Sequence, residues 1–230
     1  MKRIIALGGG EIKSKTTLTI DGYIANLIKQ QGKTVRGNAL FFGTASHDSM
    51  PYFNSFRKTY TSVYDVKVDV ALTVYGEMDD QKIADKIAVA DAIYVGGGDT
   101  LYMLEKWRER GITDKIIKAY ENGTILCGLS AGAICWFKDM YTDSFVMRGG
   151  TDYAFEKGLG LLDGLMTPHY AERQIDFDKA FVESDFTTAY AVENDCAIEF
   201  VDGQFTKSIS AGGKAYLLTK ENGVLIKKEI

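Results

Sequence analysis

The sequence predicts an α/β fold with a mostly parallel central sheet, helices on both faces and a region of short strands at the C-terminal end. Short apolar segments alternate with helical segments from residue 3 to about residue 129. Several of the apolar segments stop at glycines. Parallel strands joined in this way have right-handed crossovers, and binding sites form beyond the carboxyl ends of the strands.

The predicted elements follow one another with little intervening chain. Buried strands are expected over residues 3–7, 38–43, 66–70, 91–95 and 124–127. Helices are expected over residues 18–31, 51–60, 79–90, 101–110 and 112–122. The glycine-rich loops at residues 8–10, 96–100 and 128–132 all follow strands, so we expect them to gather at one edge of the sheet.

The pattern changes after about residue 137. Residues 139–150 are polar and predict an irregular segment, residues 158–162 predict a short strand, and residues 171–182 predict a helix. Short strands are expected over residues 189–192, 197–201, 205–208, 215–219 and 224–227, with hairpin turns at Asp202-Gly203 and Asn222-Gly223. Because no linker interrupts the chain, we expect residues 1–230 to form a single α/β domain.

The composition argues against several classes of protein. A net charge of −4, with both signs interspersed, does not favour nucleic acid as a partner. No apolar run is long enough to cross a bilayer, and no signal peptide is evident at the N-terminus. The three cysteines lie in apolar surroundings and indicate reduced core residues of a cytoplasmic protein. No metal and no cofactor are expected, and the oligomeric state is not predicted.

Ser130 lies in a motif typical of a nucleophile. The sequence Gly128-Leu129-Ser130-Ala131-Gly132 matches the G-x-S-x-G nucleophile elbow, in which a strand ends, the chain turns sharply and a helix begins. The alternative interpretation is a buried serine in a tight strand-to-helix turn. The other glycine cluster that suggests a ligand, residues 8–10, lacks the G-x-G-x-x-G spacing of a dinucleotide loop.

A nucleophilic serine needs a base, and the chain has only two histidines, His47 and His169. His169 is the stronger candidate, since it follows Pro168 in a loop after a predicted strand; a histidine without a catalytic role is the alternative. Glu193 and Asp143 are candidates for the group that accepts the other imidazole N–H. The oxyanion would be bound by the backbone N–H groups of Ala131 and Gly98.

Four segments together resemble a known family. They are residues 95–100, 127–133 and 167–170 and the segment around Glu193, and in this order they look like the serine peptidases that include aspartyl dipeptidase (peptidase E) and cyanophycinase. The resemblance covers the chain from the first strand to about Thr219. It implies a fold similar to class I glutamine amidotransferases and a Ser-His-Glu triad of Ser130, His169 and Glu193, with Gly98 and Ala131 as the oxyanion hole.

The resemblance also implies a substrate class, a short peptide with an acidic, Asp-like N-terminal residue. Asp143 falls near a position where the family often has an acidic residue, and Arg173 could pair with a substrate carboxylate, although a lone exposed arginine at a helix start is the alternative. Asp99 stands where the dipeptidases typically have asparagine. Residues 170–173 only partly match the cyanophycinases.

The expected function is therefore that of a serine exopeptidase or dipeptidase that forms an acyl-enzyme on Ser130. One alternative is an amidotransferase-like hydrolase of glutamine-type amides, but that family has cysteine at the position of Ser130. The other is a non-catalytic binding module of the same fold. The chain order Ser, His, Glu differs from the Ser, Asp, His order of α/β-hydrolases.

Overall fold

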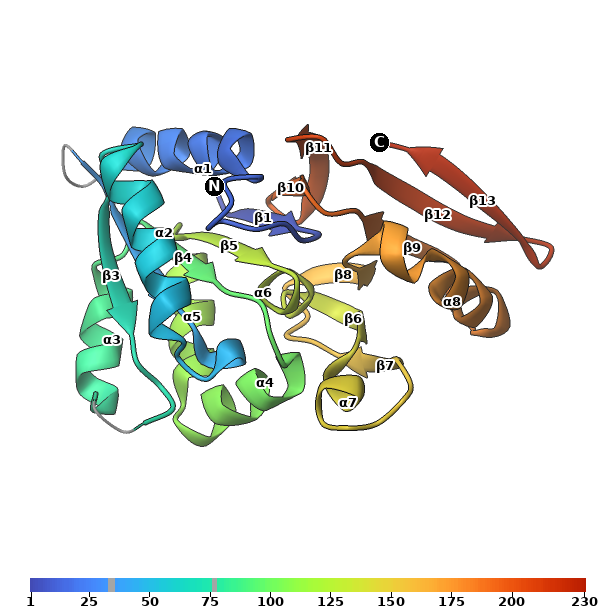
Figure 1. Cartoon of the computed structure of the whole chain (residues 1–230), viewed down its shortest axis with the longest axis horizontal. Helices are drawn as coiled ribbons and strands as arrows, with labels where there is room; N and C mark the ends of the chain where they lie inside the picture. Colours follow the sequence, from blue (N-terminus) through green and yellow to red (C-terminus); the bar gives the residue numbers. More distant parts are fainter. Residues whose placement is uncertain (33–35, 76–77) are drawn as a thin grey trace.

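The computed structural model describes residues 1–32, 36–75 and 78–230 (Figure 1). Two sheets organise these residues. The strands of the first sheet are β1 (Arg3–Leu7), β2 (Asn38–Phe42), β3 (Lys67–Ala71), β4 (Ala92–Val95), β5 (Ile125–Leu129), β10 (Cys196–Val201) and β11 (Gln204–Ser210). Their order is β11-β10-β1-β5-β4-β2-β3, and the five strands from β1 to β3 in this order are parallel.

The second sheet contains β6 (Phe137–Thr142), β7 (Ala154–Lys157), β8 (Leu162–Thr167), β9 (Thr188–Val192), β12 (Ala215–Glu221) and β13 (Val224–Glu229). Their order is β13-β12-β9-β8-β6-β7. The central pairs β6–β8 and β8–β9 are parallel, and the outer pairs are antiparallel. One apolar cluster includes Ile4 and Leu126 of the first sheet and Met140 and Met166 of the second, so the two sheets share core.

Helices cover both faces of the first sheet. On one face, α1 (Leu18–Gln31) and α2 (Met50–Ser62) bury their apolar sides. On the other face lie α3 (Asp80–Ala88), α4 (Thr100–Glu109) and α5 (Ile112–Glu121) (Figure 1). The remaining helical segments are η1 (Thr44–Ser46), α6 (Ala131–Ile134), α7 (Ser144–Met147) and α8 (Tyr170–Glu183), and α8 packs on the second sheet. This arrangement confirms the predicted fold class. No helix among the described residues is both long enough and apolar enough to cross a membrane.

Two predictions beyond residue 137 are wrong in detail. Residues 139–150 are not irregular, because Met140 and Thr142 are buried on β6 and α7 follows. Residues 158–161 form a loop into β8, in which a Cβ on Gly158 would lie 2.3 Å from the Phe137 carbonyl oxygen. The predicted C-terminal strands and both hairpins are present and divide between the sheets: the β10–β11 hairpin joins β1, whereas the β12–β13 hairpin joins β9.

A buried carboxylic acid lies on α1. Asp21 is 1% exposed and accepts hydrogen bonds from the Tyr60 hydroxyl (3.0 Å) and the Thr17 hydroxyl (2.8 Å). Burial raises the pKa of Asp21 from 3.8 to about 6, while the two hydrogen bonds oppose the increase.

We expect Asp21→Asn to stabilise the protein at pH 7.5 more than at pH 4. Between about pH 4 and 6 the folded state retains a proton that the unfolded chain has lost, so the contribution of Asp21 to the free energy of unfolding falls as pH rises through this window. A pKa difference of about 2 corresponds to roughly 3 kcal/mol. Thermal melts of the variant, with exposed Asp163→Asn as the control, measure this difference; equal changes in Tm at both pH values would contradict it.

Candidate active site

Ser130 lies at the sharp turn between β5 and α6, where its backbone has φ 54° and ψ −111°. Such a conformation costs a non-glycine residue on the order of 1–3 kcal/mol. The two neighbouring glycines allow the turn to close. A Cβ on Gly128 would lie 1.9 Å from the Gly132 carbonyl oxygen, and one on Gly132 would lie 2.1 Å from the Val95 carbonyl oxygen. The structure therefore contains the strand-turn-helix geometry that the sequence predicted.

His169 reaches Ser130 from the second sheet. It follows β8 and caps α8 in a left-handed conformation with φ 50°, and its N–H donates to the Gly8 carbonyl oxygen at 2.8 Å. Its Nε2 lies 2.8 Å from the Ser130 Oγ. This distance is suitable for a hydrogen bond and for proton transfer from the hydroxyl to the imidazole.

The imidazole of His169 sits in a mixed electrostatic environment. Burial, and then the positive charge of Arg173, lower its pKa below the usual 6.5, while the Asn194 hydrogen bond and the carboxylates of Glu172 and Asp143 oppose this change. The net lowering leaves the ring neutral at pH 7. A neutral ring can accept the serine proton.

The other histidine does not compete for this role. His47 follows η1, is exposed, and packs its ring against Tyr102 with a centroid separation of 4.3 Å. It makes no hydrogen bond to Ser130. Of the two histidines, the structure places only His169 against the serine.

Among the described residues, the hydrogen bonds of Glu193 do not include one to His169, which corrects the expected hydrogen-bonding partner of the imidazole. Its Oε2 accepts from the Lys214 N–H at 3.0 Å and its Oε1 accepts from the Tyr216 hydroxyl at 3.3 Å, because residue 193 still pairs with the chain entering β12. The next residue, Asn194, turns the other way, and its Oδ1 lies 2.6 Å from His169 Nδ1. Sequence reasoning did not identify Asn194 because the carboxylate of the adjacent Glu193 was the candidate acceptor for the imidazole N–H.

Because Gly9 has no side chain, His169 and Asn194 pack directly against the backbone of the loop after β1. A Cβ at this position would lie 2.6 Å from His169 Nδ1 and 2.0 Å from Asn194 Oδ1. Asp195 N–H also donates to the Gly9 carbonyl oxygen at 3.1 Å. The glycine cluster at residues 8–10 is therefore part of the site, although it is not a dinucleotide loop.

Gly98 and Ala131 lie on the two strand-end loops that meet at Ser130. Gly97, beside Gly98, would place a Cβ 3.4 Å from the Ser130 Cβ. The hydrogen bonds of the described residues include none donated by the backbone N–H of Gly98 or Ala131, whereas Gly97 N–H donates to the Tyr52 hydroxyl at 3.3 Å. Two uncommitted N–H groups near a serine hydroxyl could bind a developing oxyanion.

Arg173 and Asp143 form an ion pair close to the imidazole. Arg173 Nη2 donates to the Asp143 carboxylate at 2.6 Å, and the guanidinium stacks on the Tyr153 ring at 5.0 Å. Arg173 is 5% exposed and so is not the exposed helix-start arginine considered as the alternative. Among the described residues its Nη1 has no hydrogen-bonding partner.

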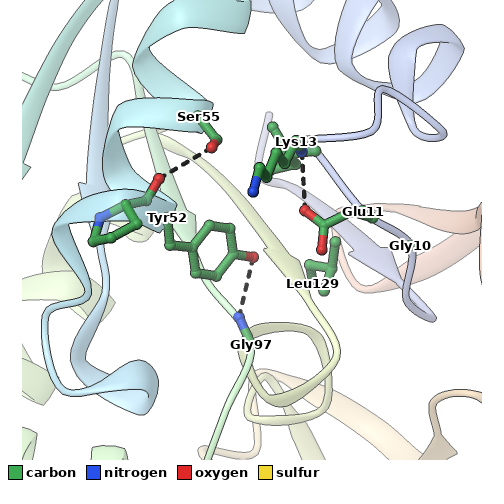
Figure 2. A pocket seen from close by; sticks show the side chains of 9 residues that line it. Gly10, Glu11, Lys13, Tyr52, Ser55, Gly97 and Leu129 are labelled. Atoms are coloured by element: carbon green, nitrogen blue, oxygen red, sulfur yellow. Dashed lines mark hydrogen bonds between the residues drawn. The ribbon is translucent and has the colours of Figure 1, made fainter.

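A cavity of about 320 Å³ opens beside the serine turn, where Leu129 and Gly97 form part of its wall. Figure 2 shows Lys13, from the loop after β1, and Tyr52, from α2, facing this space. A second cavity of about 400 Å³ shares Lys13 with the first and is also lined by Lys15 and Lys58. The two cavities share Ile12, Lys13 and Ser55 as lining residues, and both have lysine side chains in their walls.

Comparisons with known proteins agree with the expected family and with this fold. The model of peptidase family S51 matches residues 4–208. The uncharacterized peptidase YgaJ of Bacillus subtilis is 32% identical over 222 residues, which is 94% of this chain and 91% of that relative. Peptidase E of Citrobacter koseri is 44% identical over 54 residues, 22% of this chain and 24% of that protein.

Two solved structures have a similar fold. A peptidase from an acI-B1 Actinobacterium has a TM-score of 0.72 at 14% identity, with coverage of 100% of this chain and 94% of that one. A putative peptidase E from Listeria monocytogenes EGD-e has a TM-score of 0.63 at 19% identity, with coverage of 100% and 99%. The chain belongs to peptidase family S51, and it is a serine-type peptidase.

Gly9→Ala is expected to reduce activity strongly, because the added methyl group collides with both His169 and Asn194. Gly203→Ala is the matched control. Gly203 also has a positive φ, of 81°, but a Cβ there meets nothing within 4 Å. Activity and thermal stability of the two variants separate the steric effect from backbone strain. Equal activity in both variants would exclude the proposed packing.

Proposed function

We propose that this protein is a serine exopeptidase of the dipeptidase type, which hydrolyses short peptides through an acyl-enzyme on Ser130. The observation that carries the proposal is the 2.8 Å contact between Ser130 Oγ and His169 Nε2 at the strained turn after β5. A lowered histidine pKa supports a neutral base at pH 7.

In the proposed reaction, His169 Nε2 takes the Ser130 proton as Oγ attacks the scissile carbonyl carbon. The N–H groups of Gly98 and Ala131 stabilise the oxyanion of the tetrahedral intermediate. The imidazolium then protonates the leaving amine, and the C–N bond breaks. Water, deprotonated by the same imidazole, attacks the ester and releases the acid and the free serine.

Asn194 Oδ1 takes the place in this scheme that the sequence assigned to Glu193. It accepts a hydrogen bond from the His169 Nδ1–H and so keeps Nε2 free to act as the base. Glu193, which hydrogen-bonds to Lys214 and Tyr216, is assigned no step in the reaction. Asp143 acts on the imidazole only through its charge and through its ion pair with Arg173.

Three lysines lie in the walls of the two cavities near the serine turn. Lys13 lines the first cavity together with the carboxylate of Glu11, and Lys15 and Lys58 line the second. Arg173, near His169, keeps one guanidinium nitrogen without a partner among the described residues. Ammonium and guanidinium groups pair with carboxylates, so these positions support a preference for an Asp-like N-terminal residue.

The three cysteines, unpaired and buried, support a reducing, cytoplasmic compartment.

Ser130→Ala and His169→Gln are each expected to lower kcat by about 10⁴-fold or more, because each removes a reacting group. His47→Gln is the control, since it changes the other histidine, which packs on Tyr102. Hydrolysis of a dipeptide library measures the loss, and fluorophosphonate labelling of the wild type measures the reactivity of the serine. Unchanged turnover by Ser130→Ala would contradict the mechanism; glutaminase activity without peptidase activity would favour an amidotransferase-like hydrolase.

Lys13→Gln is expected to lower kcat/KM for an Asp-initiated dipeptide about two- to fivefold relative to its Asn-initiated analogue, since an exposed ion pair contributes about 0.2–1 kcal/mol. Lys29→Gln on α1, outside both cavities, controls for the change in net charge. The ratio of kcat/KM for the two peptides is the measurement. A ratio that does not change in Lys13→Gln would exclude a role of Lys13 in recognising the acidic residue.

A further inference from the structure

The side chain of Glu172 extends the hydrogen-bonded series of Ser130, His169 and Asn194 by one residue. Asn194 Oδ1 lies 2.6 Å from His169 Nδ1, and Asn194 Nδ2 donates to Glu172 Oε1, also at 2.6 Å. Four side chains are therefore connected in series, from Ser130 through His169 and Asn194 to Glu172. Neither the motif nor the family resemblance assigned a role to Glu172.

An amide beside a catalytic imidazole presents a problem that a carboxylate does not. The oxygen and nitrogen of the amide have nearly the same size, and a half-turn of the amide exchanges them. If Nδ2 faced His169 Nδ1, the imidazole would have to accept there and carry its proton on Nε2. Nε2 would then donate to Ser130 and could not take its proton.

We propose that Glu172 is a positioning residue that holds the Asn194 amide with its oxygen toward His169 and thereby selects the Nδ1–H tautomer of the imidazole. This inference rests on the proposed function, in which His169 is the base. An ionised carboxylate only accepts hydrogen bonds, so it binds the Nδ2 side of the amide and disfavours the flipped orientation.

The position of Glu172 in the fold suits this role. His169 caps α8 and Glu172 lies three residues later, so both side chains project from the same face of the first helical turn. Glu172 N–H also donates to the His169 carbonyl oxygen at 3.0 Å. The same backbone turn thus fixes the imidazole and the carboxylate relative to one another.

The other charged groups around His169 are engaged elsewhere. Asp143 pairs with Arg173, Asp195 accepts from the Thr16 hydroxyl at 2.5 Å, and Glu193 accepts from Lys214 N–H. Among the described residues, the hydrogen bonds of the Asn194 side chain go only to His169 and Glu172. Glu172 is therefore the group that distinguishes the two ends of the amide.

The direct test reads the tautomer. With ¹⁵N-histidine labelling and His47→Gln for assignment, we expect His169 to carry its proton on Nδ1 at pH 7.5 in the wild type. Glu172→Gln, whose amide can donate as well as accept, should give a mixture of tautomers. Glu183→Gln, at the far end of α8, is the matched control and should match the wild type. Identical tautomer populations in all three would overturn the proposal, and this readout does not depend on activity.

The kinetic test uses the same substitution. Glu172→Gln should lower kcat up to about tenfold with little change in KM, since one exposed, charge-assisted hydrogen bond is replaced by one that the glutamine amide can make in either direction. The acidic limb of kcat/KM should also move to lower pH, because Glu172 raises the pKa of His169 against the lowering by Arg173.

Asn194→Asp provides the rescue, because a carboxylate has no wrong orientation. In that background the new charge repels Glu172, so adding Glu172→Gln should raise kcat instead of lowering it. If Glu172→Gln lowered kcat by the same factor in the wild type and in Asn194→Asp, Glu172 would have a merely structural role and the proposal would be overturned. Failure of the proposed function is recognised separately, by hydrolysis that persists in Ser130→Ala while the tautomer result stands.

Discussion

This site depends on glycines at which two backbone segments touch directly, with no side chain between them. At Gly98, Gly128 and Gly132, an added Cβ would lie within 2.1 Å of a backbone carbonyl oxygen. Gly128 and Gly132 close the turn at Ser130 and bring it against the end of β4, and Gly98 brings the loop after β4 against η1. Since a real Cβ needs more than 3 Å, each position accepts a side chain only if the neighbouring strand or loop moves. Such movement would displace the serine itself.

The two sheets contribute different parts of the site. The first sheet supplies the turn that carries Ser130 and the loop that carries Gly98, both on parallel strands whose carboxyl ends share an edge. The second sheet supplies His169 after β8 and Asn194 after β9, which are also parallel neighbours. The hydrogen bond from His169 N–H to the Gly8 carbonyl oxygen joins the two sets of loops. The geometry of the serine and imidazole therefore depends on how the sheets pack.

This division explains what the sequence could and could not predict. Ser130, Gly98 and the parallel strands were predictable because glycine-terminated apolar segments carry a strong local signal. The hydrogen-bonding partner of the imidazole was not predictable, because Glu193 and Asn194 are adjacent in sequence. The direction in which each of the two side chains points depends on where the pairing with β12 ends. The burial of Arg173 was not predictable either, because it involves contacts with Asp143 and Tyr153, which are distant in sequence.

A neutral amide next to the imidazole changes the electrostatics of the proposed reaction. A carboxylate in contact with Nδ1 would stabilise the imidazolium that forms when Ser130 is deprotonated, but it would also raise the pKa of the resting histidine. Here the contacting group is uncharged, and the carboxylates of Glu172 and Asp143 act from farther away, against the charge of Arg173. The resting imidazole consequently stays neutral, because burial and Arg173 outweigh the acids. The site thus keeps its base available at neutral pH, and it stabilises the imidazolium less than a contacting carboxylate would.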